Sequence, residues 1–336
     1  MKMGLTMGAL AAILAVTATG CTTQRYWGGS TAVGNNTQAK IGLVTKTDTN
    51  PYFVSLRQSA QAEASKLGAQ FTALAGKFDG DNDGQVTAIE NLVQRGVTTI
   101  LITPNSATGV LSAIKQARDK GIMVVALDTE TDPASAVDAT YATDNTAAGR
   151  QEGQYVKAIL GDKPPQLLML DGTPGSTVDT QRHTGFLQGF GLSDGDPAII
   201  GHQSVNGDQS QAQQGMENLL QRATTVNAVY TLNEPTARGA YAALQARGLT
   251  GQVVMGSIDG GCQGVQDVKD GKYGATVMQF PAKMAALGVD AAVEYAKSGK
   301  KPSGFQNTGS MVITDKPVPG ISSQDTTWGL QNCWGK

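Results

Sequence analysis

Charged side chains are scarce in this 336-residue chain. They make up 16 % of the residues, against roughly 25 % in an average soluble domain. The net charge is −2, from 26 basic and 28 acidic residues, so the basic surface that nucleic-acid binding requires is missing. With two histidines and three cysteines, the chain has little material for a zinc site. The composition predicts a globular protein with no metal, no other cofactor and no nucleic-acid partner.

The sequence also offers little support for catalysis. Neither His183 nor His202 has a serine or cysteine partner in a recognisable catalytic pattern. The glycine-rich stretch 171–177 lacks the lysine of a phosphate-binding P-loop. We therefore do not expect an enzyme.

One metal-binding pattern does occur. Asp79, Asp81, Asp83 and Glu90 match the spacing of a calcium-binding loop. An EF-hand needs a helix before this loop, whereas residues 71–75 read as a strand. We therefore predict an acidic strand-to-helix turn with helix capping, and no metal site.

The N-terminus has the features of an export signal. Lys2 is followed by an apolar stretch, 3–19, which is shorter than the roughly 20 residues of a comfortable membrane span. Small residues then precede Cys21 and resemble a bacterial lipobox, so we expect a lipoprotein signal peptide over 1–20 and a lipid on Cys21. The alternative is an ordinary secretory signal. Residues 21–39 are polar and rich in Gly, Ser, Thr and Asn, which is typical of a flexible tether.

Export to an oxidising compartment bears on the other two cysteines. If Cys21 carries a lipid, Cys262 and Cys333 remain as an even pair. We expect them to form a disulfide, with two free buried thiols as the alternative. The lipid on Cys21 would then be the only attachment to a membrane.

The rest of the chain alternates short apolar runs with stretches of helical periodicity. The runs are continuously apolar, as in parallel strands that are covered on both faces. The predicted strands are 40–44, 71–75, 99–102, 123–127, 167–170, 199–202, 228–232, 253–257 and 275–279, with a short one near 141–144. Helices are predicted from Pro51 to Gly68, over 86–95 and over 110–120, and between the later strands. The length favours two domains, so we predict an α/β fold of two doubly wound, Rossmann-like lobes.

Polar and aromatic side chains stand where these strands end. Ligands bind at the carboxyl ends of strands in such sheets, and two facing edges form a cleft. Amides, carboxylates and an arginine offer paired hydrogen bonds to vicinal hydroxyls, while aromatic rings cover C–H surface. This combination predicts a sugar ligand. The candidate ligand-binding residues are Asn50, Tyr52, Phe53, Asp128, Arg182, Asn233, Asp259 and Gln279.

Several of these residues lie in strings that resemble a known family. The strings TNPYF, ALD, RHTGF, LNEP, SIDGG and MQFP occur in the order and spacing of periplasmic sugar-binding proteins of ABC importers, of the ribose-binding type. The strings KTDTNPYF, AGKFDGDN and NCWG resemble the fructose-binding subgroup in particular. The resemblance extends from Lys40 to Gly335. It implies a two-lobed protein that closes over one monosaccharide and delivers it to a membrane permease.

The resemblance also implies how the chain is divided. In this family three strands cross between the lobes as a hinge, here near Asp144, Gln279 and Thr308. The N-terminal lobe would then comprise 40–144 plus 281–308, and the C-terminal lobe 145–280 plus 309–336. It implies that the candidate residues above contact the ligand.

Two departures bear on the choice of sugar. The ribose-binding pattern has an arginine where this chain has Thr129, and an aromatic residue where it has Gly207. The larger pocket favours a hexose such as fructose, with mannose or ribose as alternatives, and Asp48 or Lys46 could replace the lost contact. A receptor for chemotaxis or for a sensor kinase, or a non-sugar solute such as an amino acid, stays open. A sugar-responsive repressor is excluded by the export signal and by the missing helix-turn-helix before Lys40.

Overall fold

The computed structural model describes Met1, residues 38–223 and residues 225–335. Apart from Met1, the predicted signal peptide, Cys21 and the tether as far as residue 37 lie outside the described residues. Of the predicted tether, Gln38 and Ala39 are described; Ala39 is buried, and its carbonyl accepts a hydrogen bond from the Gln70 amide at 2.8 Å. In the part of the chain that the structure describes, no helix has both the length and the apolar character needed to cross a membrane.

Within the described residues, the first sheet has six parallel strands in the order β11-β5-β4-β3-β1-β2. The strands are β1 (Lys40–Thr45), β2 (Gln70–Ala75), β3 (Thr99–Ile102), β4 (Met123–Leu127), β5 (Ala139–Ala142) and β11 (Gly304–Asn307). A short 3₁₀ helix, η1, spans Ala134–Ala136.

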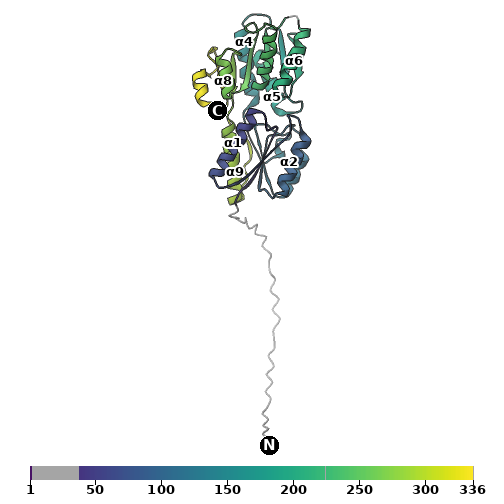
Figure 1. The fold of residues 1–336 in the computed structure, drawn as a ribbon, viewed down its shortest axis with the longest axis vertical. Helices are drawn as coiled ribbons and strands as arrows, with labels where there is room; N and C mark the ends of the chain where they lie inside the picture. The colour runs from purple at the N-terminus through teal and green to yellow at the C-terminus, as the bar shows by residue number, and fades with distance from the viewer. Residues whose placement is uncertain (2–37, 224, 336) are drawn as a thin grey trace, which may run out of the picture. The chain divides into compact units, whose positions relative to one another are not determined.

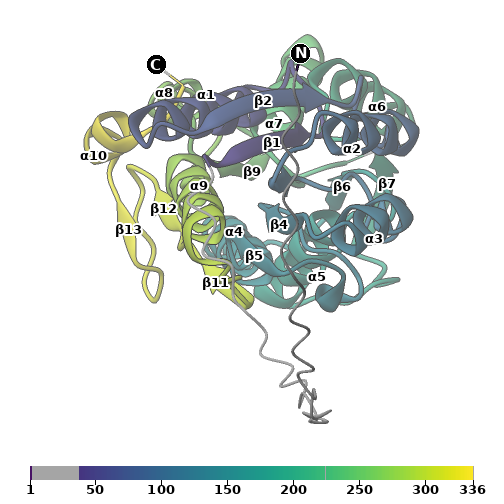
Figure 2. The same ribbon diagram turned by 90° about the horizontal axis from the view of Figure 1, so that it is seen from below.

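Helices cover both faces of this sheet (Figure 2). On one face lie α1 (Pro51–Lys66) and α9 (Pro281–Ser298), and on the other α2 (Asn82–Gln94) and α3 (Leu111–Asp119). In β4, for example, Val125 packs toward α1 and α9, while Val124 packs toward α2 and α3. Both faces are buried, which explains why these strands read as continuous apolar runs.

The second sheet of the described chain has seven strands in the order β13-β12-β10-β9-β8-β6-β7, and β12 runs antiparallel to β10. The strands are β6 (Leu167–Asp171), β7 (Ile199–Ser204), β8 (Ala228–Thr231), β9 (Val254–Asp259), β10 (Ala275–Met278), β12 (Met311–Ile313) and β13 (Ser323–Gln324). The helices are α4 (Asn145–Leu160), α5 (Thr177–Phe190), α6 (Gln209–Arg222), α7 (Glu234–Ala246), α8 (Cys262–Lys269) and α10 (Thr326–Asn332). Figure 1 shows α4, α5, α6 and α8 around this sheet, and α1, α2 and α9 around the first.

The helices α4 and α5 pack closely through glycines. A Cβ at Gly153 would clash with the Phe186 carbonyl oxygen, and one at Gly149 would clash with the Arg182 carbonyl oxygen. Larger residues would therefore separate the two helices. This close contact fixes the position of α5, the helix that bears Arg182, relative to the second sheet.

Within residues 38–223 and 225–335, the chain passes between the two sheets at three places: from β5 to α4, from β10 to α9, and from β11 to β12. The crossings expected near Asp144, Gln279 and Thr308 lie in these connections. Two of the connections are tied together, because the Thr308 amide donates to the Ala142 carbonyl at 2.8 Å. We propose the division of the chain at residues 144, 280 and 308 on this basis, and call the two parts the N-terminal and C-terminal lobes.

The α/β fold with two largely parallel sheets is confirmed, and most strands lie within two residues of their predicted bounds. The strand expected near 141–144 ends earlier, at Ala142, because Asp144 caps α4 by accepting from the Ala147 amide at 2.9 Å. Strands β12 and β13 were not predicted; they are only three and two residues long.

The acidic loop after β2 is a helix cap, as predicted. α2 begins at Asn82, four residues before the expected start, and the Asp81 carboxylate accepts from the amides of Gly84 and Lys77, both at 2.9 Å. These backbone hydrogen bonds lower the pKa of Asp81. In the described ranges, no group of three or more His, Cys, Asp or Glu side chains is arranged to hold a metal ion.

Candidate ligand-binding pocket

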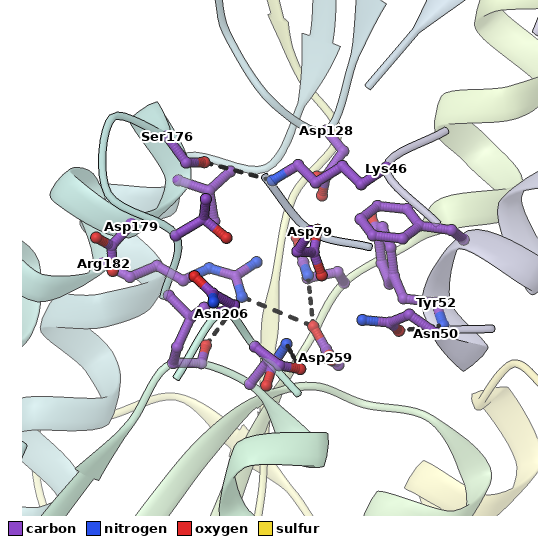
Figure 3. Close-up of a pocket in the computed structure, with 17 residues that line it drawn as sticks. Lys46, Asn50, Tyr52, Asp79, Asp128, Ser176, Asp179, Arg182, Asn206 and Asp259 are labelled. Atoms are coloured by element: carbon purple, nitrogen blue, oxygen red, sulfur yellow. Dashed lines mark hydrogen bonds and ion pairs between the residues drawn. The ribbon is translucent and has the colours of Figure 1, made fainter. Parts of the chain in front are cut away.

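A pocket lies between the carboxyl ends of the two sheets, and Figure 3 shows the side chains that line it. Its empty space is about 440 Å³, part of which is open solvent. Every candidate ligand residue predicted from the sequence lines this pocket: Asn50, Tyr52, Phe53, Asp128, Arg182, Asn233, Asp259 and Gln279. They meet because parallel strands end at the same edge of a sheet, and the two edges face each other.

The aromatic part of the wall comes from the start of α1. Asn50 caps this helix by accepting from the Tyr52 amide at 3.0 Å, so the cap fixes the two rings that follow. Tyr52 and Phe53 are buried and meet edge to face, with ring centroids 5.5 Å apart. Burial raises the pKa of the Tyr52 phenol well above its ordinary value, so this side chain is neutral near pH 7.

Arg182 is the most extensively held side chain of the pocket. Its Nε donates to Asn145 Oδ1 at 2.8 Å and its Nη1 to the Leu232 carbonyl at 3.0 Å, while Nη1 lies 3.7 Å from Asp259 Oδ1. The residue is only 3 % exposed. Since the guanidinium has five donors, this arrangement fixes the fork and leaves donors for a ligand.

Asp259 and Gln279 form a pair on the same side. Gln279 Nε2 donates to Asp259 Oδ1 at 3.0 Å, whereas Gln279 Oε1 is buried with no hydrogen-bond partner. A buried acceptor without a donor is unfavourable. A ligand hydroxyl in the pocket would satisfy it. Burial raises the pKa of Asp259, and Arg182 opposes this effect.

Backbone strain is concentrated at the pocket. In the described part of the chain, the non-glycine residues with positive φ are Asp128, at 65°, Asn206, at 52°, and Asp259, at 148°. All of them line the pocket. Such conformations cost of order 1–3 kcal/mol and persist where the surroundings impose them, often at binding sites. The strained backbone therefore lies at the same pocket that the sequence motifs indicate as the ligand site.

The sequence reasoning did not place Asp79 in this site, and it named Lys46 only as one of two substitutes. Lys46 follows β1 directly and its Nζ donates across the cleft to Ser176 Oγ at 3.3 Å (Figure 3). Burial raises the pKa of Asp79 to about 6, and Lys46 partly opposes this effect. Asp48, the other proposed substitute, is exposed and does not line the pocket.

Other lining residues were missed as well. Asp179, on α5, has a pKa raised to about 6, chiefly by burial. The remaining ones are Thr173, Ser176, Val178, Asn206 and Leu232, whereas Gly207, which the sequence analysis singled out, also lines the pocket. Most come from two loops, after β6 and after β7. The sequence could have identified these residues, because both loops follow predicted strands and ligands bind at the carboxyl ends of such strands.

Hydrogen bonds join the lobes across the mouth of the cleft. Glu130 receives two of them, from Thr177 Oγ1 to its carbonyl at 2.8 Å and from Gln181 Nε2 to its carboxylate at 2.7 Å. The Ala107 amide donates to the Gly175 carbonyl at 2.8 Å. The two lobes are therefore in a closed arrangement over the pocket.

Comparison with known proteins agrees with this architecture. Residues 41–301 match the family described as "Periplasmic binding protein domain". The chain belongs to this periplasmic binding protein family. A curated member, the ribose import binding protein of Salmonella typhimurium, is 33 % identical over 275 residues, which cover 81 % of this chain and 90 % of that protein.

Solved structures of the family superimpose on most of the chain. One is an ABC transporter solute-binding protein from Actinobacillus succinogenes with bound D-allose. It has 27 % identity and a TM-score of 0.74, and the match covers 82 % of this chain and 98 % of that one. Another, from Agrobacterium vitis with bound D-fucose, has 26 % identity and a TM-score of 0.76, with 84 % and 97 % covered. These relatives are binding proteins.

Outside the pocket lining, Cys262 and Cys333 form a disulfide with their Cα atoms 4.9 Å apart. It joins the start of α8 to the residue after α10. Such a bond is chemically reasonable in a family of periplasmic proteins, because disulfides persist in oxidising compartments.

Proposed function

We propose that this protein is the substrate-binding component of an ABC sugar importer. It captures one monosaccharide between its lobes and delivers it to a membrane permease. The observation that carries the proposal is the pocket itself: two aromatic rings face a set of amides, carboxylates and one fixed guanidinium contributed by both lobes. Rings cover the C–H surface of a sugar, and the polar groups pair with its hydroxyls. The relatives with bound D-allose and D-fucose support this proposal.

The mechanism follows from the two-sided lining. Asn50 and Asp128 come from the N-terminal lobe, and Arg182 and Asn233 from the C-terminal lobe. A sugar can satisfy both sets only when the lobes are together, so binding favours the closed state. The permease would recognise that state.

Fructose is the sugar we propose, with mannose or ribose as alternatives. Thr129 does not line the pocket; its hydroxyl donates to Asp128 Oδ2 at 2.8 Å and so orients the carboxylate. Gly207 has a φ of +64°, and a Cβ there would lie only 2.9 Å from Asn233 Nδ2, so a side chain at this position would crowd Asn233. Neither residue extends a large side chain into the pocket, which supports a hexose, and the Lys46 ammonium can donate to a ring oxygen or an anomeric hydroxyl.

We also propose that the protein is exported and attached to the membrane through a lipid on Cys21. The support is the apolar stretch before Cys21 and the family to which the chain belongs. Intact-mass analysis of the protein purified from membranes tests this proposal. A mature chain that begins at Cys21 with added acyl mass is expected, and an unmodified N-terminus at another residue would contradict it.

Isothermal titration of the mature chain against fructose, ribose, mannose, glucose and galactose tests the binding function. We expect one saturable ligand with a Kd of about 1 μM, or roughly −8 kcal/mol, and fructose to bind tightest. Tighter binding of ribose would retain the sugar function and reject fructose. No binding of any of the five sugars would contradict the proposed function.

A further inference from the structure

Trp334, near the C-terminus, contacts the wall of the pocket on the side that faces away from its interior. Trp334 does not line the pocket, yet it contacts two residues that do. Figure 1 shows the C-terminus beside α8, near the start of α1. The proposed binding mechanism assigns no role to this segment.

The disulfide fastens Trp334 in place. Cys333 precedes it and is bonded to Cys262, and the Cys262 amide donates to the Trp334 carbonyl at 2.9 Å. Gly261 and Trp334 form an isolated parallel β-bridge. The tryptophan is thus attached both covalently and through its backbone to the loop that follows β9.

One contact of Trp334 is with the backbone of Asp259. The indole Nε1 donates to the Asp259 carbonyl at 3.0 Å, and the Gln279 amide donates to the same oxygen at 2.8 Å. Asp259 has the unfavourable φ of 148°. Two donors on its carbonyl help to hold that conformation, which sets the direction of the carboxylate.

The other contact is with Tyr52 on the opposite lobe. The rings of Tyr52 and Trp334 meet edge to face, with centroids 5.4 Å apart. Such a pair contributes beyond its buried area. Trp334 therefore links a pocket residue of the N-terminal lobe to a pocket residue of the C-terminal lobe, and both links exist together when the lobes are closed.

We propose that Trp334 is a positioning residue for ligand binding and that the Cys262–Cys333 disulfide acts on ligand affinity through it. The inference rests on the proposed function, because affinity for the sugar is its measure. Reduction of the disulfide would free the terminal segment, remove both contacts and weaken binding. The pocket would still be complete in its lining residues.

Substitution of Trp334 separates its two contacts. Titration uses whichever of the five sugars binds the parent chain. Trp334→Ala removes ring and donor, and we expect Kd to rise about 20-fold. Trp334→Phe keeps a ring against Tyr52 and loses the donor, so about a threefold rise is expected. Trp328→Phe on α10 is the matched control and should leave Kd unchanged, because Trp328 neither lines the pocket nor pairs with Tyr52 or Asp259.

A double-mutant cycle tests the link to the disulfide. Cys262→Ser with Cys333→Ser should raise Kd about tenfold, and adding Trp334→Ala to that pair should raise it by no more than about twofold further. Circular dichroism checks that each variant is folded. Fully additive effects would mean that the disulfide acts on binding by another route and would overturn that part of the proposal.

Intrinsic fluorescence gives a second readout. If Trp334 only supported the fold, its surroundings and its emission would be the same with and without ligand. The parent should show a ligand-dependent change in tryptophan emission that Trp334→Phe abolishes and Trp328→Phe retains. If the parent binds a sugar and Trp334→Ala binds it equally well, the positioning role is wrong while the proposed function survives. If the parent binds none of the five sugars, the proposed function fails and the positioning role fails with it.

Discussion

The two walls of the pocket differ in how firmly their polar groups are held. On the C-terminal lobe, Arg182 is fixed by Asn145 and Leu232, and Asp259 by its neighbours. On the N-terminal lobe, within the described chain, the Lys46 ammonium has one hydrogen bond, which reaches across the cleft to Ser176, and the Asp79 carboxylate has none. The first arrangement is formed before a ligand arrives, whereas the second depends on closure.

Because of this difference, we expect the two walls to contribute differently to ligand binding. Polar groups that are already fixed lose little conformational entropy when a ligand binds. They can therefore discriminate between sugars that differ in the position of a hydroxyl. A looser wall with two aromatic rings can close over sugars of different ring form. We therefore expect changes in the C-terminal wall to reduce affinity most, and changes in the N-terminal wall to alter selectivity and pH dependence.

The largest effect is expected from the C-terminal wall. Arg182→Ala, and separately Asp259→Ala, should each weaken sugar binding by at least ~2 kcal/mol, because ligand hydroxyls and the remaining partner are left unpaired in a closed site. Titration calorimetry measures the loss. Arg150→Ala, an exposed arginine on α4 that bonds Gln188, is the control. Binding of either pocket variant at parental affinity would show that this wall is not the ligand site.

A smaller effect is expected at the N-terminal wall. Lys46→Met removes the cross-cleft hydrogen bond to Ser176 and a cation in the pocket. Affinity should fall by about 1.5 kcal/mol, and the ratio of affinities for fructose and ribose should change. The same titration series measures both, with the exposed Lys77→Met as the control. An unchanged ratio would mean that Lys46 has no part in selecting the sugar.

The raised pKa of Asp79 predicts a pH dependence of stability. Its folded pKa of about 6 lies above the ordinary 3.8, chiefly through burial, so the folded state binds more protons between these values. The contribution of Asp79 to stability is then greatest below about pH 4 and is lost as the pH rises through 6. Asp79→Asn should stabilise the ligand-free protein at pH 7 by about 1 kcal/mol, after allowance for partial exposure.

Thermal unfolding at pH 5 and pH 7, with and without the substitution, measures this effect. The gain from Asp79→Asn should be larger at pH 7 than at pH 5. Asp83→Asn, in the same loop but outside the pocket lining, should change neither melting temperature appreciably. An equal gain at both pH values would contradict the assigned titration.

The smallest effect is expected behind the C-terminal wall. His183, the neighbour of Arg182 on α5, bonds Asp171 at 2.7 Å and Asp194 at 2.8 Å, and the bond to Asp171 is the main cause of its pKa of about 9. Stability from this raised pKa is complete below the ordinary value of 6.5 and disappears as pH rises through 9. His183→Gln should cost less than about 1 kcal/mol at pH 7.

Chemical unfolding at pH 7 and pH 9.5 checks this prediction. The cost should be smaller at the higher pH, where the imidazole is neutral in both states. His202→Gln, whose side chain is 73 % exposed, is the control and should be without effect. A cost that is equal at both pH values would mean that the charge of His183 is irrelevant to stability.

Much of the pocket could be predicted because many of its polar residues lie at the carboxyl ends of parallel strands. Asp128, Asp259 and Gln279 each stand at or directly after the end of a buried strand, and such positions share one edge of a parallel sheet. Asp79 was not found by the same rule because its motif was considered only as a metal loop or as a helix-capping turn. The strand-end rule could not identify Trp334, because its contact with Asp259 depends on a disulfide between cysteines 71 residues apart.

The sequence by itself determined the alternation of buried strands and helices, the polar residues at the strand ends and the pair of cysteines available for a bridge. These are local properties of composition and spacing. The tertiary structure alone decided which groups face each other across the cleft: Lys46 opposite Ser176, Glu130 against α5, and Trp334 between Tyr52 and Asp259. Such pairs join distant segments through the packing of the two lobes, and no local pattern encodes that geometry.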